Sequence, residues 1–281
     1  MHIHWFPGHM TKALRMMEQE VVAVDAIIYM LDARAPRSCI NPAFDSIIGP
    51  RPVLYILNKS DLVTQSEVKL WVDYFSDLGK QALSITSTSR GIKPKIVQAL
   101  KQACAPVIQK YLDKGVKKTI RAMVIGIPNS GKSTLINSLA GFKKTVTGNK
   151  PGVTRGKQWI SIDPYIDVMD TPGTLYPDFN DQAKAVRLAL IGSIRDEITD
   201  IIGLATEAIV FLKKEYPLSL LNACPNIKAE QDALTILDKV ALARGYLLQG
   251  GKLDIERAAR AIINDLRKLK FGKIIYEKPD E

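Results

Sequence analysis

The chain has 281 residues, of which 46% are hydrophobic and 24% are charged, a composition typical of globular proteins with room for two ordinary domains. This excludes a disordered, collagen-like or coiled-coil chain, and no apolar run approaches the roughly 18 residues that a membrane span needs. Thirty-nine Lys and Arg residues against 29 Asp and Glu residues leave a net charge of +10.

The N-terminus, residues 1–8, has neither the basic segment nor the apolar segment of a secretory signal. The three cysteines are far apart and form no C-x-x-C pair, which argues against a disulfide framework and a zinc site. We therefore expect a cytoplasmic protein without membrane contact. All three histidines, His2, His4 and His9, lie near this end. A hydrated terminus or a metal chelate of the H-x-H pair would account for them without catalysis.

From residue 25 onward the sequence alternates apolar, strand-like runs with helical patterns. The predicted elements are strands over 25–31, 52–57, 81–85 and 120–125, helices over 66–78 and 94–112, and a β-hairpin over 159–169. This alternation predicts an α/β sheet with helices on both faces.

The first motif in the chain is Asn58-Lys59-Ser60-Asp61, at the end of the second predicted strand. Asp61 at a strand end can accept two hydrogen bonds from guanine, from N1–H and the N2 amine, and adenine offers no such pair. Asn58 and Lys59 would brace the base and a phosphate-binding loop. Thr86 and Ser87, after the next strand, would complete the base pocket. N-K-x-D alone occurs often by chance.

The positive charge is concentrated in residues 110–157, which hold 11 basic residues and one acidic residue, Asp113. Clustered Lys and Arg residues supply salt-dependent affinity for a phosphate backbone, so the block predicts a polyanionic partner such as RNA. A solvated surface with a few bound phosphates is the alternative, and composition does not decide between them.

Residues 126–133 match G-x-x-x-x-G-K-[ST] and lie between a predicted strand and a predicted helix over 133–139. In this context the glycines let backbone N–H groups surround nucleotide phosphates at a helix N-terminus. Lys132 can reach the β- and γ-phosphates, and Ser133 can ligate magnesium. The expected phosphate-binding residues of this loop are Asn129, Ser130, Gly131, Lys132 and Ser133.

Two further elements indicate a nucleotide switch. Asp170-Thr-Pro-Gly173 ends the hairpin, where the Asp170 carboxylate suits a magnesium contact and Gly173 a γ-phosphate contact. Thr154 lies between the phosphate loop and this motif, where a threonine can complete the magnesium shell. By themselves, D-x-P-G is a common turn and Thr154 an ordinary loop residue.

Beyond Pro177 the strand-like runs stop, and residues 196–214, 229–243 and 254–270 have helical spacing. We therefore predict two domains, an α/β domain over 1–177 and a smaller all-α domain over 178–281.

The order of these motifs is unusual, because in ordinary small GTPases the phosphate loop comes first and the guanine motif last. The order here is guanine motif (58–61), base-pocket loop (86–87), phosphate loop (126–133), switch threonine (154) and D-x-x-G (170–173). The chain resembles the circularly permuted GTPases of the YlqF/RbgA type, bacterial ribosome biogenesis GTPase A. W-F-P-G-H-M at 5–10 and D-A-R-A-P at 32–36 also carry the likeness, which spans nearly the whole chain.

The resemblance implies a P-loop GTPase sheet with circularly permuted motif order, followed by the helical domain. It implies hydrolysis of GTP to GDP with magnesium, and a role in assembling the large (50S) ribosomal subunit. That subunit would stimulate the GTPase and its rRNA would be the RNA partner; we expect a monomer. The rival hypothesis is a nucleotide-gated RNA-binding module with incidental hydrolysis. A switch acting on protein partners would leave the charge block unexplained.

The resemblance also suggests two residue roles. Ordinary GTPases have a water-orienting glutamine directly after D-x-x-G, where this chain has Thr174 and the family usually an aliphatic residue. In the family the histidine of the P-G-H motif is implicated in catalysis, which corresponds to His9. Related GTPases with asparagine at the position of Asn129 bind potassium beside the phosphates. An Asn129 that only caps the loop is the alternative.

Permutation also changes the connection between the switch and the rest of the chain. Residues 174–181 join the D-x-x-G motif directly to the helical domain. We expect this segment to transmit the state of the γ-phosphate to that domain, with a passive linker as the alternative.

Overall fold

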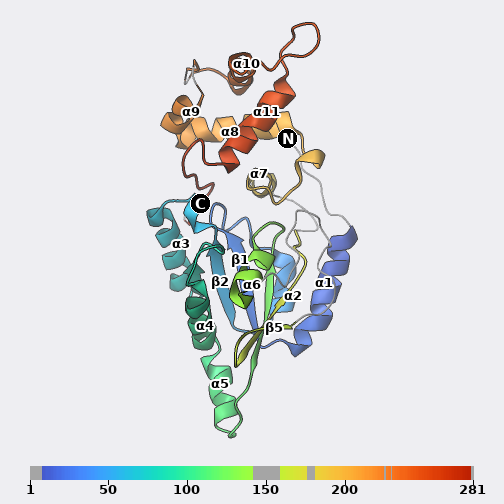
Figure 1. Ribbon diagram of the computed structural model, residues 1–281, viewed down its shortest axis with the longest axis vertical. Coiled ribbons are helices and arrows are strands. Elements are labelled where there is room, and N and C mark those ends of the chain that lie inside the picture. The colour runs from blue at the N-terminus through green and yellow to red at the C-terminus, as the bar shows by residue number, and fades with distance from the viewer. Residues whose placement is uncertain (1–7, 142–158, 176–180, 225, 229, 280–281) are drawn as a thin grey trace. The chain divides into compact units, whose positions relative to one another are not determined.

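The computed structural model describes residues 8–141, 159–175, 181–224, 226–228 and 230–279 (Figure 1). Two compact units are present, one built around a β-sheet and one built from helices. The last described residues, from Glu277 onward, belong to the sheet unit. The domain boundary predicted at 177–178 lies outside the described residues and stays a prediction.

A six-stranded sheet with the order β3-β2-β1-β4-β6-β5 forms the first unit. Its strands are β1 (Ala26–Asp32), β2 (Val53–Asn58), β3 (Gln81–Ser84), β4 (Ile120–Gly126), β5 (Trp159–Asp163) and β6 (Ile166–Asp170). Neighbouring strands are parallel except for β5 and β6, which form an antiparallel hairpin. The predicted strands, the hairpin and the α/β class are therefore confirmed.

Helices cover both faces of this sheet. Ile96 of α4 and Leu135 of α6 join the core on one face with alternate strand residues such as Ile28. On the other face the ring of Tyr55 stacks between Tyr29 and Phe75 of α3, with centroids 5.6 and 4.9 Å apart. The helices of this unit are α1 (Gly8–Glu20), α2 (Asp45–Ile48), α3 (Gln65–Asp77), α4 (Ile92–Ala103), α5 (Ala105–Leu112) and α6 (Lys132–Ala140).

The prediction of one helix over 94–112 was wrong, because α4 and α5 are separate helices that meet at Cys104. Pro106 is the cause. A proline has no backbone N–H to donate to the carbonyl of Gln102, and its ring collides with that carbonyl in a continuous helix. In the second position of a new helix the missing N–H costs nothing.

The second unit consists of helices in its described part, and no helix described in the chain is long and apolar enough to cross a membrane. Aspartates begin most of them: the Asp200 carboxylate accepts from Gly203 N–H at 3.0 Å, and Asp232 from Thr235 N–H at 2.9 Å. Helical content over the three predicted stretches is confirmed, whereas α1, α2, α7 and α9 were not predicted. The helices are α7 (Gln182–Leu190), α8 (Ile201–Glu215), α9 (Pro217–Ala223), α10 (Ala233–Ala243) and α11 (Ile255–Arg267).

Candidate functional site

The sequence motifs meet at one edge of the sheet, where the carboxyl ends of four parallel strands lie side by side. Asp32 at the end of β1 pairs in register with Asn58 of β2, and Met30 pairs with Gly126 of β4. Asp170 at the end of β6 pairs with Val124 of β4. Ligands of open α/β sheets bind at this edge, because loops and helix N-termini gather there.

The phosphate loop has the conformation that its glycines allow. Gly126 and Gly131 have φ of +150° and +98°. A Cβ on Gly126 would lie 2.5 Å from the Met30 carbonyl oxygen, and one on Gly131 would lie 2.3 Å from Asn58 Nδ2. Asn129 also has positive φ, 58°. Only glycine fits the two close approaches, so the loop can wrap tightly before α6 begins at Lys132.

Lys132 is the buried cation of this loop. Its ammonium donates to the carbonyls of Gly126 at 3.1 Å and Ile127 at 2.9 Å, folding the side chain back over the loop. Burial lowers the pKa of Lys132 to about 8, although the negative charge of Asp170 opposes this shift. A bound polyphosphate would therefore stabilise the charged form of this buried lysine.

GTP binding at pH 8 is expected to take up a fraction of a proton. The pKa of Lys132 is about 8 in the nucleotide-free protein, and negative phosphates raise it. Above that pH the amine must gain a proton on binding, so GTP affinity falls as pH rises from about 8 toward 10. Calorimetry in two buffers of different ionisation enthalpy measures the uptake, and Lys132→Arg should abolish it. Proton release or pH-independent affinity contradicts this prediction.

Asn58 joins the guanine motif to the phosphate loop. Its Nδ2 donates to the Ser130 carbonyl at 2.7 Å, and its Oδ1 accepts from Ser87 N–H at 3.0 Å and Ser87 Oγ at 2.8 Å. One buried amide thus ties together three predicted parts of the site. On the exposed side, Thr86 Oγ1 donates to Asp61 Oδ1 at 2.9 Å, which leaves Asp61 accessible from solvent.

Sequence reasoning missed Asp32 and Arg34 as members of the site. The buried Asp32 carboxylate pairs with Lys59 Nζ at 2.9 Å and accepts from Arg34 Nε at 2.9 Å and Nη2 at 2.8 Å. The two cations hold the pKa of Asp32 well below its usual value against the opposing effect of burial. Lys59 itself has φ of +59°. The available signal was an acidic residue at the end of β1, the strand adjacent to the N-K-x-D strand.

Asp170 and Ser133 form an oxygen-rich pair beside Lys132. Ser133 Oγ donates to Asp170 Oδ2 at 2.5 Å, while Asp170 Oδ1 is buried without a hydrogen-bond partner in the described part of the chain. Burial raises the pKa of Asp170. A hydroxyl and a carboxylate with an unsatisfied oxygen are suitable donors for Mg²⁺, so these residues fit the predicted ion. Thr154, the third predicted magnesium residue, lies outside the described residues.

Gly173 closes the site on the side of the phosphate loop. A Cβ there would lie 2.7 Å from the backbone of Pro128 and 2.8 Å from Lys132 Nζ. Thr174 follows it and is fully buried, and its carbonyl accepts from Asn41 Nδ2 at 3.5 Å. Thr174 Oγ1 has no hydrogen-bond partner in the described structure. Thr174 therefore occupies a core position, where it does not replace a water-orienting glutamine.

Thr174→Val is expected to raise the free energy of unfolding by about 1 kcal/mol, because it removes a buried hydroxyl without a partner and keeps a side chain of similar shape. GTP turnover should stay within about twofold. Urea unfolding of the nucleotide-free protein, with Thr206→Val as a control whose hydroxyl donates to Ile202 O, measures the difference. A less stable Thr174→Val protein, or a large loss of turnover, would assign the hydroxyl a partner in the working site.

His9 lies in the first turn of α1, and its side chain is outside the described residues. Its neighbour Met10 is buried, and Met10 Sδ accepts from Leu175 N–H at 3.5 Å. The start of α1 is thereby attached to the residue that follows Thr174. The distance from His9 to the phosphate loop is not defined by these contacts.

Comparison with known proteins places this site in context. Residues 121–239 match the family model described as 50S ribosome-binding GTPase. Ribosome biogenesis GTPase A of Bacillus cereus is 38% identical over 100% of this chain and 95% of that protein. The protein of the same name from Thermotoga maritima is 29% identical over 99% of this chain and 95% of that protein. The structure titled GDP-bound YlqF has a TM-score of 0.72 at 24% identity, covering 95% of this chain and 100% of the other.

Proposed function

The chain belongs to the ribosome biogenesis GTPase A family and is a GTP-hydrolysing ribosome assembly factor, and from this premise we propose how its site works and what activates it. The large ribosomal subunit and its rRNA are the proposed partners, and binding to them stimulates turnover. The protein acts as a cytoplasmic monomer. Two domains, expected over 1–177 and 178–281, divide nucleotide hydrolysis from the helical part, except that the described residues from Glu277 onward belong to the sheet unit.

The observation that carries this proposal is the bridge made by Asn58. Its amide joins the phosphate loop at Ser130 to the base-pocket loop at Ser87. The guanine motif, the phosphate loop and Asp170 thus converge at one sheet edge although their order in the chain is permuted. A parallel sheet depends on which strands are neighbours, whatever their order along the chain.

The residues have distinct roles toward GTP. Asp61 accepts hydrogen bonds from the guanine edge. Its neighbours are fixed by their own contacts: Lys59 pairs with Asp32, and Thr86 donates to Asp61. Backbone N–H groups of residues 129–133 and the Lys132 ammonium face the phosphates, and Gly173 faces the γ-phosphate. Ser133, Asp170 and Thr154 would hold magnesium, and the ion would supply positive charge to offset that of the phosphates.

His9 orients the attacking water in this proposal. The contact of Met10 with Leu175 supports it, because it attaches the start of α1 to the residues just after the switch. The burial of Thr174 also supports it, because that side chain does not face solvent. Contact of the large subunit with the N-terminal segment would then couple partner binding to turnover.

Asn129 would hold a potassium ion, whose positive charge would take the role that an arginine finger has elsewhere. Its φ of 58° in the loop is compatible with this role and equally with a purely structural cap. Turnover in potassium buffer compared with sodium buffer of equal ionic strength distinguishes the two.

The nucleotide state reaches the helical unit through two covalent routes. Residues 174–181 form the first; Asp181 at its end caps α7 by accepting from Lys184 N–H at 3.2 Å. Glu277 begins the second, directly after Tyr276 of the helical unit. The Glu277 carboxylate accepts from Ser38 N–H at 2.9 Å and Ser38 Oγ at 2.6 Å, in the segment that follows β1. Sequence analysis did not identify this second route.

The decisive experiment is GTP turnover with and without large ribosomal subunits. Strong stimulation supports a subunit-activated enzyme. GTP-dependent docking on the subunit without increased turnover supports the rival, a nucleotide-gated RNA-binding module. Small subunits at the same concentration provide the control for non-specific RNA effects.

A further inference from the structure

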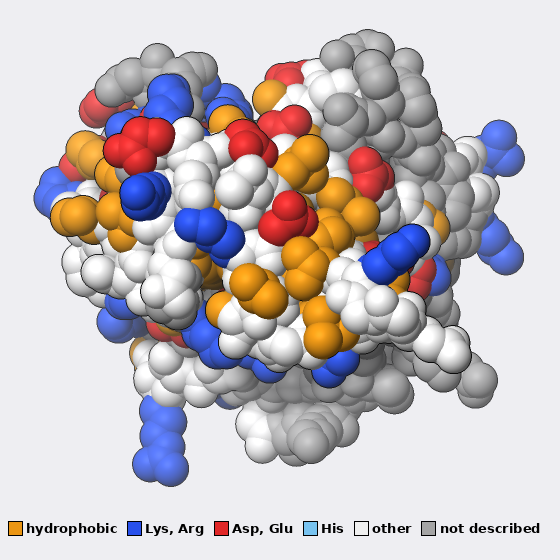
Figure 2. All heavy atoms as spheres, turned by 90° about the horizontal axis from the view of Figure 1, so that it is seen from above, with side chains coloured by type: hydrophobic (Ala, Val, Ile, Leu, Met, Phe, Trp, Pro, Cys, Tyr) orange, Lys and Arg blue, Asp and Glu red, His pale blue; other side chains and the backbone are white. Residues whose placement is uncertain are grey.

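A basic surface lies on α4, α5 and the turn after them, outside the GTP site. Residues 88–121 contain nine basic residues and one acidic residue, Asp113. In contrast, the face in Figure 2 carries acidic and basic side chains with hydrophobic ones between them. The exposed members, here called the α4–α5 strip, are Arg90, Lys93, Lys95, Lys101, Lys110, Lys114 and Lys117.

Most of the strip has no ion-pair partner among the residues that the structure describes. Among the described residues, Lys93 and Lys95 have no ion-pair partner. Asp113, the single acid of this segment, accepts from Gln109 Nε2 at 2.7 Å. By contrast, Lys118 pairs with Asp25 at 2.7 Å and lies over the Tyr111 ring. Lys118 therefore has a structural role, and the available charge extends instead toward the start of α4, beyond the block that the sequence suggested.

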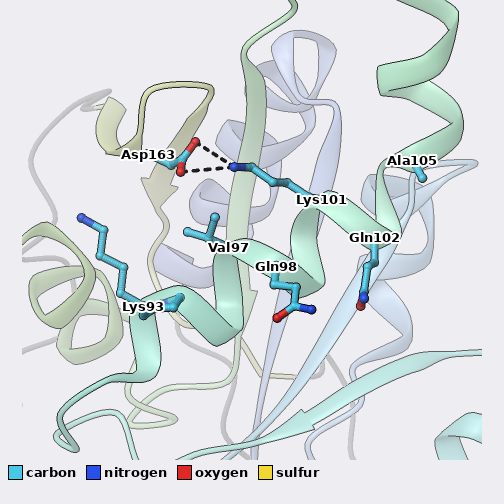
Figure 3. A pocket seen from close by; sticks show the side chains of 8 residues that line it. Lys93, Val97, Gln98, Lys101, Gln102, Ala105 and Asp163 are labelled. Atoms are coloured by element: carbon cyan, nitrogen blue, oxygen red, sulfur yellow. Dashed lines mark hydrogen bonds and ion pairs between the residues drawn. The ribbon is translucent and has the colours of Figure 1, made fainter.

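A groove of about 660 Å³ runs along α4 in this strip (Figure 3). Lys93 and Lys101 flank it eight residues apart, which is ~12 Å along a helix. The rest of the lining includes apolar groups, such as Val97, and the amides of Gln98 and Gln102. Ammonium groups suit phosphates, the amides suit hydroxyl groups and the apolar floor suits ribose carbons, a combination that fits a ribonucleotide backbone.

One carboxylate reduces the charge of the groove. Asp163, the last residue of β5, lies 3.3 Å from Lys101 Nζ, and Figure 3 shows the Lys101 side chain reaching it. The Lys101 side chain is 46% exposed, so the pair is solvated and weak. Asp163 Oδ1 also accepts from Tyr165 N–H at 3.2 Å, which an asparagine could preserve.

We propose that the α4 groove and the α4–α5 strip bind an RNA backbone, separately from the GTP site. This rests on the proposed function, in which rRNA is the partner, and adds the surface that contacts it. Lys93, Lys95 and Lys101 contact phosphates. An acidic protein partner is the competing occupant, and it would bind this surface only on the intact subunit.

The first test measures the affinity for large subunits and for protein-free rRNA over a range of salt concentrations. Lys93→Gln/Lys95→Gln/Lys101→Gln should weaken both affinities by about tenfold to a hundredfold. The negative slope of log K against log salt should become shallower by about two. Lys12→Gln/Lys69→Gln/Lys80→Gln removes the same charge from exposed positions elsewhere in the sheet unit and should barely change the slope. GTP affinity should be unchanged in both triple variants.

Asp163→Asn provides a test that misfolding cannot imitate. It frees Lys101 while keeping the turn, so RNA binding should tighten severalfold and the salt slope steepen by up to about one. Equal salt slopes in the wild type and in the Lys93→Gln/Lys95→Gln/Lys101→Gln variant overturn this proposal, and the proposed GTPase function is unaffected by that result. Loss of subunit binding with unchanged binding to free rRNA assigns the surface to a protein and also overturns it. Wild-type protein that binds neither subunit nor rRNA contradicts the proposed function itself.

Discussion

His9→Ala is expected to lower subunit-stimulated GTP turnover by a factor on the order of ten to ten thousand, the range typical of a positioned catalytic group. GTP affinity and subunit affinity should stay within about twofold. The reason is that Thr174 is buried in the core at the position where other GTPases have glutamine, so another side chain must orient the water. The start of α1 is attached to Leu175 through Met10, so the residue directly after His9 contacts the segment that follows the switch motif.

The matched controls are His2→Ala and His4→Ala, assayed at saturating GTP and saturating large subunit. Turnover close to that of the wild type in both controls would support a specific role for His9. Equal losses in all three variants would indicate a metal site or a general requirement for an ordered N-terminus. Full stimulated turnover in His9→Ala removes this residue from the mechanism.

Asp61→Asn is expected to weaken GTP binding by about a hundredfold or more and to favour xanthine nucleotides. Guanine presents two donors to the carboxylate, and an amide places its own donor against one of them, which leaves buried polar groups unpaired. Xanthine has a carbonyl oxygen where guanine has the N2 amine, and this oxygen accepts from the asparagine amide. Thr86 can still donate to the remaining oxygen of residue 61, so the local structure should persist.

Parallel titrations with GTP and xanthosine triphosphate measure this change of specificity. Asp77→Asn, an exposed position near the end of α3, is the control for the loss of one negative charge. Unchanged GTP affinity in Asp61→Asn excludes the guanine contact, whatever happens with the other nucleotide.

The strands and the position of the nucleotide motifs were accessible from the sequence for a local reason. Buried parallel strands are continuous apolar runs, and the functional residues follow directly at their ends, as Asn58 follows Val53–Leu57. Capping aspartates such as Asp200 and Asp232 mark helix starts in the same local way. The break between α4 and α5 is equally local, because Pro106 cannot continue a helix from the preceding turn but is tolerated in the first turn of a new one.

Other features depend on residues that are far apart in the chain. Asp32 becomes part of the guanine site only because β1 and β2 are neighbours in register, which brings it to Lys59. The attachment of Glu277 to Ser38 joins positions 239 residues apart, and no local pattern encodes it.

The sequence by itself determined that this chain binds and hydrolyses a guanine nucleotide, because motif chemistry and motif order are properties of the chain. Only the tertiary structure decided which charges remain available and which are used internally. Lys117 and Lys118 are adjacent residues of the same type, yet Lys117 is exposed and Lys118 pairs with Asp25. The physical reason is that a charge acts on a partner only where folding leaves it solvent-accessible and without a carboxylate beside it.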